Sequence, residues 1–233
     1  MRPIVFVCVL VVFLAAGCKN EKDFFEKGKK VKSGFVWERS PIKADEILAG
    51  KSVKPVCEEN FERAEFGEKW QIQGGEWKIE NGWAFSPKAE NRNLVFKGCP
   101  LPEKSVVEMD LRSETDFVDI KFNLYGDGGI HDHGDGYSFI MGGWKNQMSV
   151  LTKLHEHEEN RVEERETRWK QSTVYHVKVI KLSKKIYWFV NDEIFLARFD
   201  DAPLSPANDY KYLSLANWRS LVYFDNIRVS SIE

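Results

Sequence analysis

Polar side chains that could bind a ligand or a metal ion gather in one glycine-rich stretch, GDGGIHDHGDGYSFIMGGW. Seven of the sixteen glycines fall between Gly126 and Gly143, and none follows Gly143. Glycine reaches backbone conformations closed to other residues, so this stretch is predicted to form loops. Its carboxylate and imidazole side chains are Asp127, His131, Asp132, His133 and Asp135. The aromatic residues that flank or follow them are Tyr125, Tyr137 and Trp144.

One interpretation of this stretch is a carbohydrate site. Carboxylates and imidazoles can hydrogen-bond sugar hydroxyls, and aromatic rings can stack on the apolar face of a pyranose. The predicted ligand-binding residues are therefore Tyr125, Asp127, His131, His133, Asp135, Tyr137 and Trp144. A solvated loop whose charged residues serve only solubility would carry the same residue types, and the sequence leaves both interpretations open.

A metal site is another interpretation, because His155 and His157 follow in a second polar cluster, Lys153 to Glu159. Side chains two residues apart in an extended segment lie on one side, so two His-x-His pairs on adjacent loops would offer four imidazoles to a transition metal. Three aspartates would instead hold calcium through oxygen. These residues do not establish a cofactor, and calcium is the candidate that we retain. The candidate metal ligands are Asp127, Asp132, Asp135, His131, His133, His155 and His157.

A catalytic interpretation rests on Glu108, Asp110 and Glu114. The segment that contains them resembles the Glu-x-Asp-x-x-Glu strand of laminarinase-type glycoside hydrolases, where two carboxylates about 5 Å apart act as nucleophile and general acid/base. Strand alternation places the three acids on one face, opposite apolar residues. The third acid comes one residue too late for the motif, and a core strand with a polar outer face gives the same pattern. The three acids are therefore only weak catalytic candidates.

The elements expected to position these residues are β-strands. Asn81-Gly82 separates two alternating segments and supplies the positive φ of a type I′ turn, which predicts a hairpin, and Asn191-Asp192 repeats the arrangement. Helical periodicity is confined to residues 35–50 and to the region Asn160 to Lys170. About a dozen strands without βαβ alternation predict an all-β fold, an antiparallel two-sheet jelly-roll sandwich over residues 55–233.

Four segments carry a resemblance to a known superfamily. They are FERAEFGEKWQIQGGEWKIENGWAFS, DGYSFIMGGWKNQMSVL, YHVKVIKLSKKIYWFVNDEIFLARFDD and VYFDNIRV. The order is similar to that of bacterial concanavalin A-like lectin/glucanase domains, above all laminin-G-like and 3-keto-disaccharide-hydrolase-like ones. The resemblance implies a jelly roll that recognises carbohydrate, with a glycoside hydrolase or a non-catalytic protein-interaction module as alternatives. The hydrolase-like domains carry an Asn-Ser-Gly-Ile type segment that is absent here, so no catalytic residue is transferred.

The N-terminal segment predicts export. Residues 3–16 form an uncharged apolar run of 14 residues, too short at about 1.5 Å per residue to span a bilayer core of about 30 Å. Leu14-Ala15-Ala16-Gly17-Cys18 resembles the lipobox of bacterial lipoproteins, which implies a signal peptide over residues 1–17 and lipidation of Cys18. Residues 18–54 are then a charged tether; ten basic and six acidic residues after the cysteine leave it at net +4.

These features predict a lipoprotein anchored to a membrane outside the cytoplasm, in the periplasm or at the cell surface, and Lys19 slightly favours the outer membrane. Cys57 and Cys99 are predicted to form a disulfide in that oxidising compartment, with two buried thiols as the alternative. A net charge of -2 and a pI of about 6.3 argue against a nucleic-acid binder. The expected partners are the membrane and a carbohydrate, and no oligomeric state is predicted.

Overall fold

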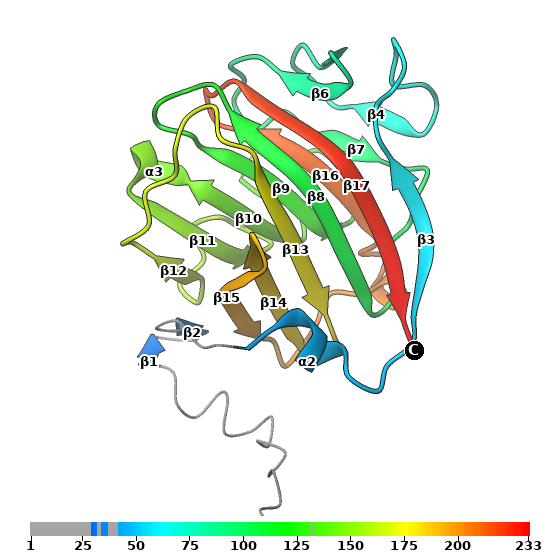
Figure 1. Ribbon diagram of the computed structural model, residues 1–233, viewed down its shortest axis with the longest axis vertical. Coiled ribbons are helices and arrows are strands. Elements are labelled where there is room, and N and C mark those ends of the chain that lie inside the picture. The colour runs from blue at the N-terminus through cyan, green and yellow to red at the C-terminus, as the bar shows by residue number, and fades with distance from the viewer. Residues whose placement is uncertain (1–28, 32–33, 37–41, 132) are drawn as a thin grey trace, which may run out of the picture.

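In the computed structural model the chain forms a sandwich of two antiparallel β-sheets (Figure 1). The structure describes residues 29–31, 34–36, 42–131 and 133–233. The predicted signal peptide, the lipidation at Cys18 and the candidate ligand Asp132 lie outside the described residues. The prediction of an all-β, two-sheet jelly-roll sandwich is confirmed.

Within the described residues one sheet has ten strands and the other has seven. The larger sheet has the order β1 (Lys29–Val31), β2 (Gly34–Val36), β15 (Glu193–Phe199), β14 (Lys185–Val190), β13 (Tyr175–Lys181), β8 (Ser105–Ser113), β17 (Val222–Ile232), β6 (Trp83–Ser86) and β5 (Lys78–Glu80), with β3 (Val53–Glu59) also paired to β17. The smaller sheet has the order β12 (Val162–Glu164), β11 (Met148–Lys153), β10 (Tyr137–Gly142), β9 (Ile120–Gly126), β16 (Tyr212–Asn217), β7 (Leu94–Phe96) and β4 (Trp70–Ile72). The short helical segments are α2 (Ala44–Leu48), α3 (Gly143–Asn146) and η1 (Pro206–Asn208).

The core fills the space between the two sheets because alternate residues of each strand point inward. In β9, Phe122 belongs to the core, whereas its neighbours Lys121 and Asn123 point to the outer face of the seven-stranded sheet. Phe122 stacks on Phe139 of β10 with ring centroids 4.7 Å apart, and Trp188 of β14 packs edge-on against both rings. Truncating such a buried aromatic residue typically costs about 3–5 kcal/mol.

The predicted hairpins form where the turn residues reach positive φ. Asn81 and Gly82 have φ values of 53° and 76° between β5 and β6. Asn191 and Asp192 have φ values of 49° and 64° between β14 and β15. Asparagine, aspartate and glycine tolerate these values, which the right-handed twist of the flanking strands favours.

The predicted disulfide joins Cys57 of β3 to Cys99, with Cα atoms 6.3 Å apart. The strand β3 starts at Val53, two residues before the predicted domain boundary at residue 55, and pairs with the end of β17. Helix α2 packs Ala44 and Ile47 on the outer face of the ten-stranded sheet, as the helical periodicity before residue 50 indicated. No helix among the described residues is long and apolar enough to cross a membrane.

The helical interpretation of residues Asn160 to Lys170 is wrong. Val162 is buried and pairs with Leu151 as part of β12, the edge strand of the seven-stranded sheet. Glu163 accepts hydrogen bonds from Arg161 and Arg165, two residues away on either side. Burial of one apolar side chain and pairing with a neighbouring strand therefore outweigh the weak helical pattern of a charged segment.

Candidate functional site

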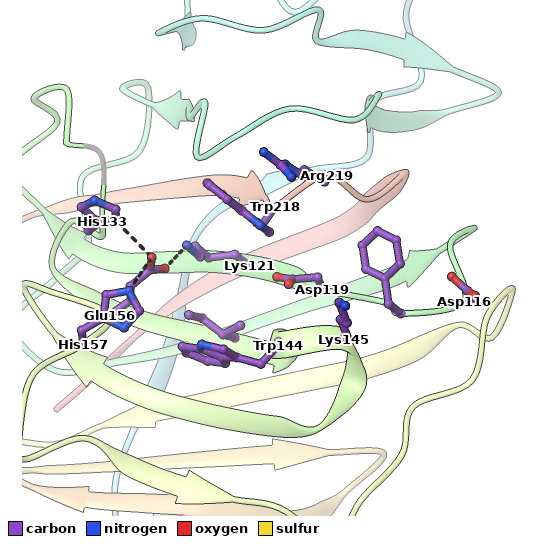
Figure 2. A pocket seen from close by; sticks show the side chains of 13 residues that line it. Asp116, Asp119, Lys121, His133, Trp144, Lys145, Glu156, His157, Trp218 and Arg219 are labelled. Carbon is purple, nitrogen blue, oxygen red and sulfur yellow. Dashed lines mark hydrogen bonds and ion pairs between the residues drawn. The ribbon is translucent and has the colours of Figure 1, made fainter.

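A groove of about 800 Å³ lies over the outer face of the seven-stranded sheet (Figure 2). Lys121 of β9 and Ile140 of β10, which are register partners on that face, form part of its floor. The other lining residues come from loops and strand ends: Asp116, Phe117, Asp119, His133, Gly143, Trp144, Lys145, Glu156, His157, Trp218 and Arg219. The rigid sheet thus supplies the floor, and five separate chain segments supply the walls.

Two tryptophans lie on opposite sides of this groove (Figure 2). Trp218 directly follows β16, pairs with Glu90 through a β-bridge and is 37% exposed. Trp144 is half-buried and packs on the apolar cluster that contains Ile140. The Arg161 guanidinium lies 5.0 Å from the centroid of the Trp144 ring, within the range of cation–π contact. The Trp144 ring is therefore supported by the cluster around Ile140 and by Arg161.

The backbone around the groove adopts left-handed conformations that residues other than glycine seldom show. The φ values are 44° at Asp119, 52° at Trp144, 61° at Lys145 and 57° at Arg219. In this region the Cβ atom crowds the next carbonyl group, at a cost of roughly 1–2 kcal/mol per residue. Strain of this kind collects at functional sites, where the surrounding structure holds it in place. Its concentration here supports the groove as the functional site.

The segment α3 holds Trp144 in this conformation. Gly142 begins the turn with φ 66°, and Asn146 ends it with φ 59°. The Asn146 side-chain amide donates to the Trp169 carbonyl at 2.8 Å and accepts from the Trp169 N–H at 3.1 Å. Asparagine tolerates positive φ better than most residues. These paired hydrogen bonds tie the turn to the loop before β13 and fix the direction of the Trp144 side chain.

A network of charged side chains crosses the floor of the groove (Figure 2). Lys121 is only 2% exposed, and its ammonium group donates to Glu156 Oε2. The other oxygen of this carboxylate, Oε1, lies 3.1 Å from His133 Nδ1 and 3.4 Å from His157 Nε2. Burial opposes ionisation of Glu156, yet the charge of Lys121 and the hydrogen bonds hold its pKa below the ordinary value. Glu156 is therefore an anion at neutral pH.

Asp119 is the opposite case. Asp119 is only 5% exposed, and this burial raises the pKa of its carboxyl group to about 7. The positive charge of Lys121 lowers this pKa, and the negative charge of Glu156 raises it further. Two carboxyl groups of the groove thus have pKa values shifted in opposite directions.

The structure places three of the sequence-predicted residues, His133, Trp144 and His157, in the groove. Tyr125 and Tyr137 are each 1% exposed and belong to the core, so the prediction that they face a ligand is wrong. The Tyr125 hydroxyl donates to the Pro102 carbonyl at 2.7 Å, and the Tyr137 hydroxyl donates to Asp200 at 2.6 Å. Tyr137 begins β10 on the core-facing side, with Phe139 and Met141. Tyr125 is the next-to-last residue of β9, and its φ of 59° breaks the alternation that would otherwise place it beside Lys121 and Asn123.

The four predicted imidazoles do not meet at one point. His133, His155 and His157 form a cluster with ring centroids 5.3–5.9 Å apart. His131 lies elsewhere, with Nε2 2.9 Å from Asp127 Oδ1 and 3.9 Å from Asp135 Oδ1. The hydrogen bond to Asp127 raises the pKa of His131. The prediction of one four-histidine centre is therefore wrong, and two smaller groups of candidate ligands replace it.

The three catalytic candidates lie away from the groove. Glu108 and Asp110 share the outer face of the ten-stranded sheet, as the alternation predicted. His176 contacts both, with Nδ1 2.8 Å from Asp110 Oδ1 and Nε2 3.6 Å from Glu108 Oε1. Glu114 follows the end of β8 and bonds Arg112 and Ser172. Glu108 and Asp110 thus contact His176 on the neighbouring strand β13, Glu114 pairs with Arg112 of its own segment, and none of the three acids lines the groove.

Sequence reasoning did not select several residues of the groove. Glu156 stood inside the recognised polar cluster but was not named as a ligand. Lys121 carried a usable signal, because it is a lone cation in the apolar strand Ile120–Gly126. Asp119 and Trp218 carried no such signal in the sequence, because only the pairing of β9 with β16 brings them to one place.

No protein-family model and no curated protein matches this chain. Solved structures do match it in fold. The carbohydrate binding module CBM66 from Bacillus subtilis has a TM-score of 0.56 at 14% identity, covering 70% of this chain and 96% of that one. SCLam, a non-specific endo-beta-1,3(4)-glucanase from family GH16, has a TM-score of 0.60 at 13% identity, covering 88% and 97%.

The endo-beta-1,3-glucanase from Pyrococcus furiosus also matches, with a TM-score of 0.54 at 12% identity, covering 80% of this chain and 97% of that one. At these identities the likeness concerns the fold. The chain therefore has the concanavalin A-like jelly-roll sandwich, a fold found in a carbohydrate-binding module and in glucanases alike.

Proposed function

We propose that this protein binds a carbohydrate in the groove over the seven-stranded sheet. The observation that carries the proposal is the placement of Trp144 and Trp218 on opposite sides of a groove that Asp119, Lys121 and Glu156 also line. A sugar ring offers an apolar C–H face to an aromatic ring and hydroxyl groups to charged side chains. The volume of about 800 Å³ lies in the range of ligand pockets.

The test is retention on immobilised polysaccharides, with a panel that includes β-1,3-glucans because glucanases share the fold. We expect Trp144→Ala and Trp218→Ala each to weaken binding roughly tenfold, since an aromatic contact contributes about 0.5–1.5 kcal/mol beyond area burial. Alanine keeps a Cβ atom, so Trp144→Ala leaves the backbone strain at φ 52° unchanged.

Trp83→Ala is the matched control. Trp83 is half-buried on β6 in the other sheet, where Arg112 lies 5.2 Å from its ring centroid. We expect this variant to bind like the wild type. Equal retention of all four proteins, or no retention of the wild type on any polysaccharide, would refute carbohydrate binding in the groove.

A second candidate function is glycoside hydrolysis in the same groove. The specific observation is the opposed pair Asp119 and Glu156, because one environment raises the pKa of its carboxyl group and the other lowers it. A protonated acid beside an ionised carboxylate is the arrangement that glycosidases use for general acid and base or nucleophile. Release of reducing ends from a bound glycan, abolished by Asp119→Asn, would favour hydrolysis. Binding without turnover leaves recognition as the function.

The proposal places this domain at a membrane through a lipid on Cys18. Its support is the lipobox-like sequence that ends at Cys18 and the disulfide between Cys57 and Cys99, which requires an oxidising compartment. Cells expressing the wild type should carry the protein in the membrane fraction, and labelled palmitate should be incorporated. Cys18→Ala should abolish the label and release the protein. Label that persists in Cys18→Ala would contradict the anchor.

A further inference from the structure

Three groove residues present donor atoms that converge on one point: His133 Nδ1, Glu156 Oε1 and His157 Nε2, all within 4.8 Å of one another. They come from the loop before β10 and the loop after β11. The Glu156 N–H donates to the His133 carbonyl at 2.7 Å, which ties the two loops together. The donors therefore lie on connected backbone rather than on two independent loops.

The separations fit a metal ion. Glu156 Oε1 lies 3.1 Å from the nitrogen of His133 and 3.4 Å from that of His157. Zinc bonds of about 2.0–2.2 Å in a tetrahedral arrangement place neighbouring ligand atoms about 3.3–3.6 Å apart. The two histidine side chains are about half exposed, at 51% and 50%, so small side-chain movements can complete the triangle.

A neighbouring side chain, Lys121, also orients the Glu156 carboxylate for metal binding. The Lys121 ammonium group donates to Asn91 Oδ1 and, of the two Glu156 oxygens, to Oε2, which orients the carboxylate and leaves Oε1 for the histidines. The ammonium of Lys121 opposes a nearby cation, whereas the carboxylate of Glu156 favours one. A second group that holds a ligand in place is typical of metal sites.

We propose that His133, Glu156 and His157 bind a divalent transition-metal ion, with zinc as the best match. Two imidazoles and one carboxylate suit zinc and its first-row neighbours, whereas calcium takes oxygen ligands. The three protein ligands leave a fourth position of a tetrahedral ion open, as in catalytic zinc sites. All three ligands line the groove, so the open position faces bound ligand. That a sugar hydroxyl occupies this position rests on the proposed carbohydrate binding.

The test is calorimetric titration of the purified full-length chain with Zn²⁺ alone after chelator treatment. We expect one site per chain. Loss of an outer partner already weakens metal binding by about 10- to 100-fold, so loss of a ligand in His157→Ala or Glu156→Gln should weaken it by more than about 100-fold. The exposed position of His157 makes its truncation compatible with folding, which circular dichroism and thermal unfolding verify.

His131→Ala is the matched control, because His131 belongs to the same glycine-rich loop but to the separate Asp127 and Asp135 group. It should bind Zn²⁺ like the wild type. If the wild type shows no saturable binding, or if His157→Ala and Glu156→Gln bind as tightly as the wild type, the metal site is overturned. A loss that occurs only in His131→Ala would also overturn it.

Glycan retention of the chelated and the zinc-loaded protein separates this inference from the proposed function. Zinc binding without any glycan retention supports the metal site and refutes carbohydrate binding. Glycan retention without zinc binding supports carbohydrate binding and refutes the metal site. If both occur, zinc should increase glycan retention of the wild type and should not change glycan retention of His157→Ala. An equal effect of zinc on the two proteins would refute the proposal that the open metal position contacts the sugar.

Discussion

At the scale of single residues, Asp119 and Glu156 show how a protein makes one side chain type behave in two ways. Both carboxyl groups lie in one groove near Lys121. Glu156 bonds the ammonium group directly, whereas Asp119 is separated from water without such a bond among the described contacts. The pKa therefore falls for one and rises for the other. At Asp119 burial outweighs the charge of Lys121, whereas at Glu156 that charge and the hydrogen bonds together outweigh burial.

Asp119→Asn should change how stability depends on pH. Folded Asp119 keeps its proton up to a pKa of about 7, while the unfolded chain loses it near 3.8. The unfolded state therefore binds fewer protons between these values, and the free energy of unfolding of the wild type falls as pH rises, by up to about 4 kcal/mol from this group. The variant should be more stable than the wild type above pH 7 and similar near pH 4.

Urea unfolding at a series of pH values measures this difference. Burial also raises the pKa of Asp225, to about 6, and this group contributes a fall of the same sign. Asp225 is present in both proteins, so its effect cancels when the two curves are subtracted. A difference curve that is flat between pH 4 and 7 would show that Asp119 is ionised in the folded state.

Tyr137→Phe tests the assignment of this ring to the core. Its hydroxyl donates to Asp200 at 2.6 Å and accepts from the Leu204 N–H at 2.9 Å. Removal leaves a buried N–H without a partner, so we expect a loss of roughly 1–3 kcal/mol in the free energy of unfolding and unchanged glycan retention. Tyr212→Phe is the control and should stay within about 0.5 kcal/mol. Unchanged stability with lost retention would instead make Tyr137 a ligand contact.

At the scale of elements, the strained backbone of α3 places Trp144 at the groove. Lys145 is exposed with φ 61°, a conformation that glycine adopts freely. Lys145→Gly relieves about 1–2 kcal/mol of crowding and costs about 0.5–1 kcal/mol in chain entropy, so it should stabilise the protein by about 1 kcal/mol. Thermal unfolding measures the change.

Gln147→Gly is the control for this prediction. Gln147 is exposed, lies two residues further along and has φ -98°, so glycine relieves nothing there. We expect it to destabilise the protein by about 0.5–1 kcal/mol. If both variants destabilise by the same amount, the left-handed conformation at Lys145 costs no free energy.

Elements differ in how far local sequence predicts them. The hairpin turns at Asn81 and Asn191 were predictable, because the residues that permit positive φ stand in the turns themselves. The strand β12 was not predictable in this way, because Val162 becomes buried only when Leu151 of β11 lies beside it. Likewise, alternation located Glu108 and Asp110 on one face but did not show which sheet face the groove occupies.

At the scale of the whole molecule, the disulfide closes a loop of the chain that contains β4 to β7. Cys57 and Cys99 are 42 residues apart in sequence, and closing a loop of that length stabilises the fold by about 4 kcal/mol in the chain-entropy model. The double variant Cys57→Ala/Cys99→Ala should lose roughly this amount in urea unfolding. Reductant should lower the stability of the wild type alone; an equal fall in the double variant would point to another cause.

The sequence alone determined the all-β class and the hairpins, because strand period and turn chemistry depend on neighbouring residues. It also limited any disulfide of residues 55–233 to Cys57 and Cys99, because this part of the chain contains only two cysteines. The groove depended on tertiary structure. Its residues come from segments as distant as Asp119 and Arg219. The Ser220 hydroxyl donates to the Asp119 carbonyl across 101 residues, and only the pairing of β9 with β10 and β16 brings these segments together. The same packing turned Tyr125 and Tyr137 inward, because burial depends on which strands lie alongside rather than on residue type. Different partners separated the two exposed histidines, since His131 bonds Asp127 and His133 bonds Glu156.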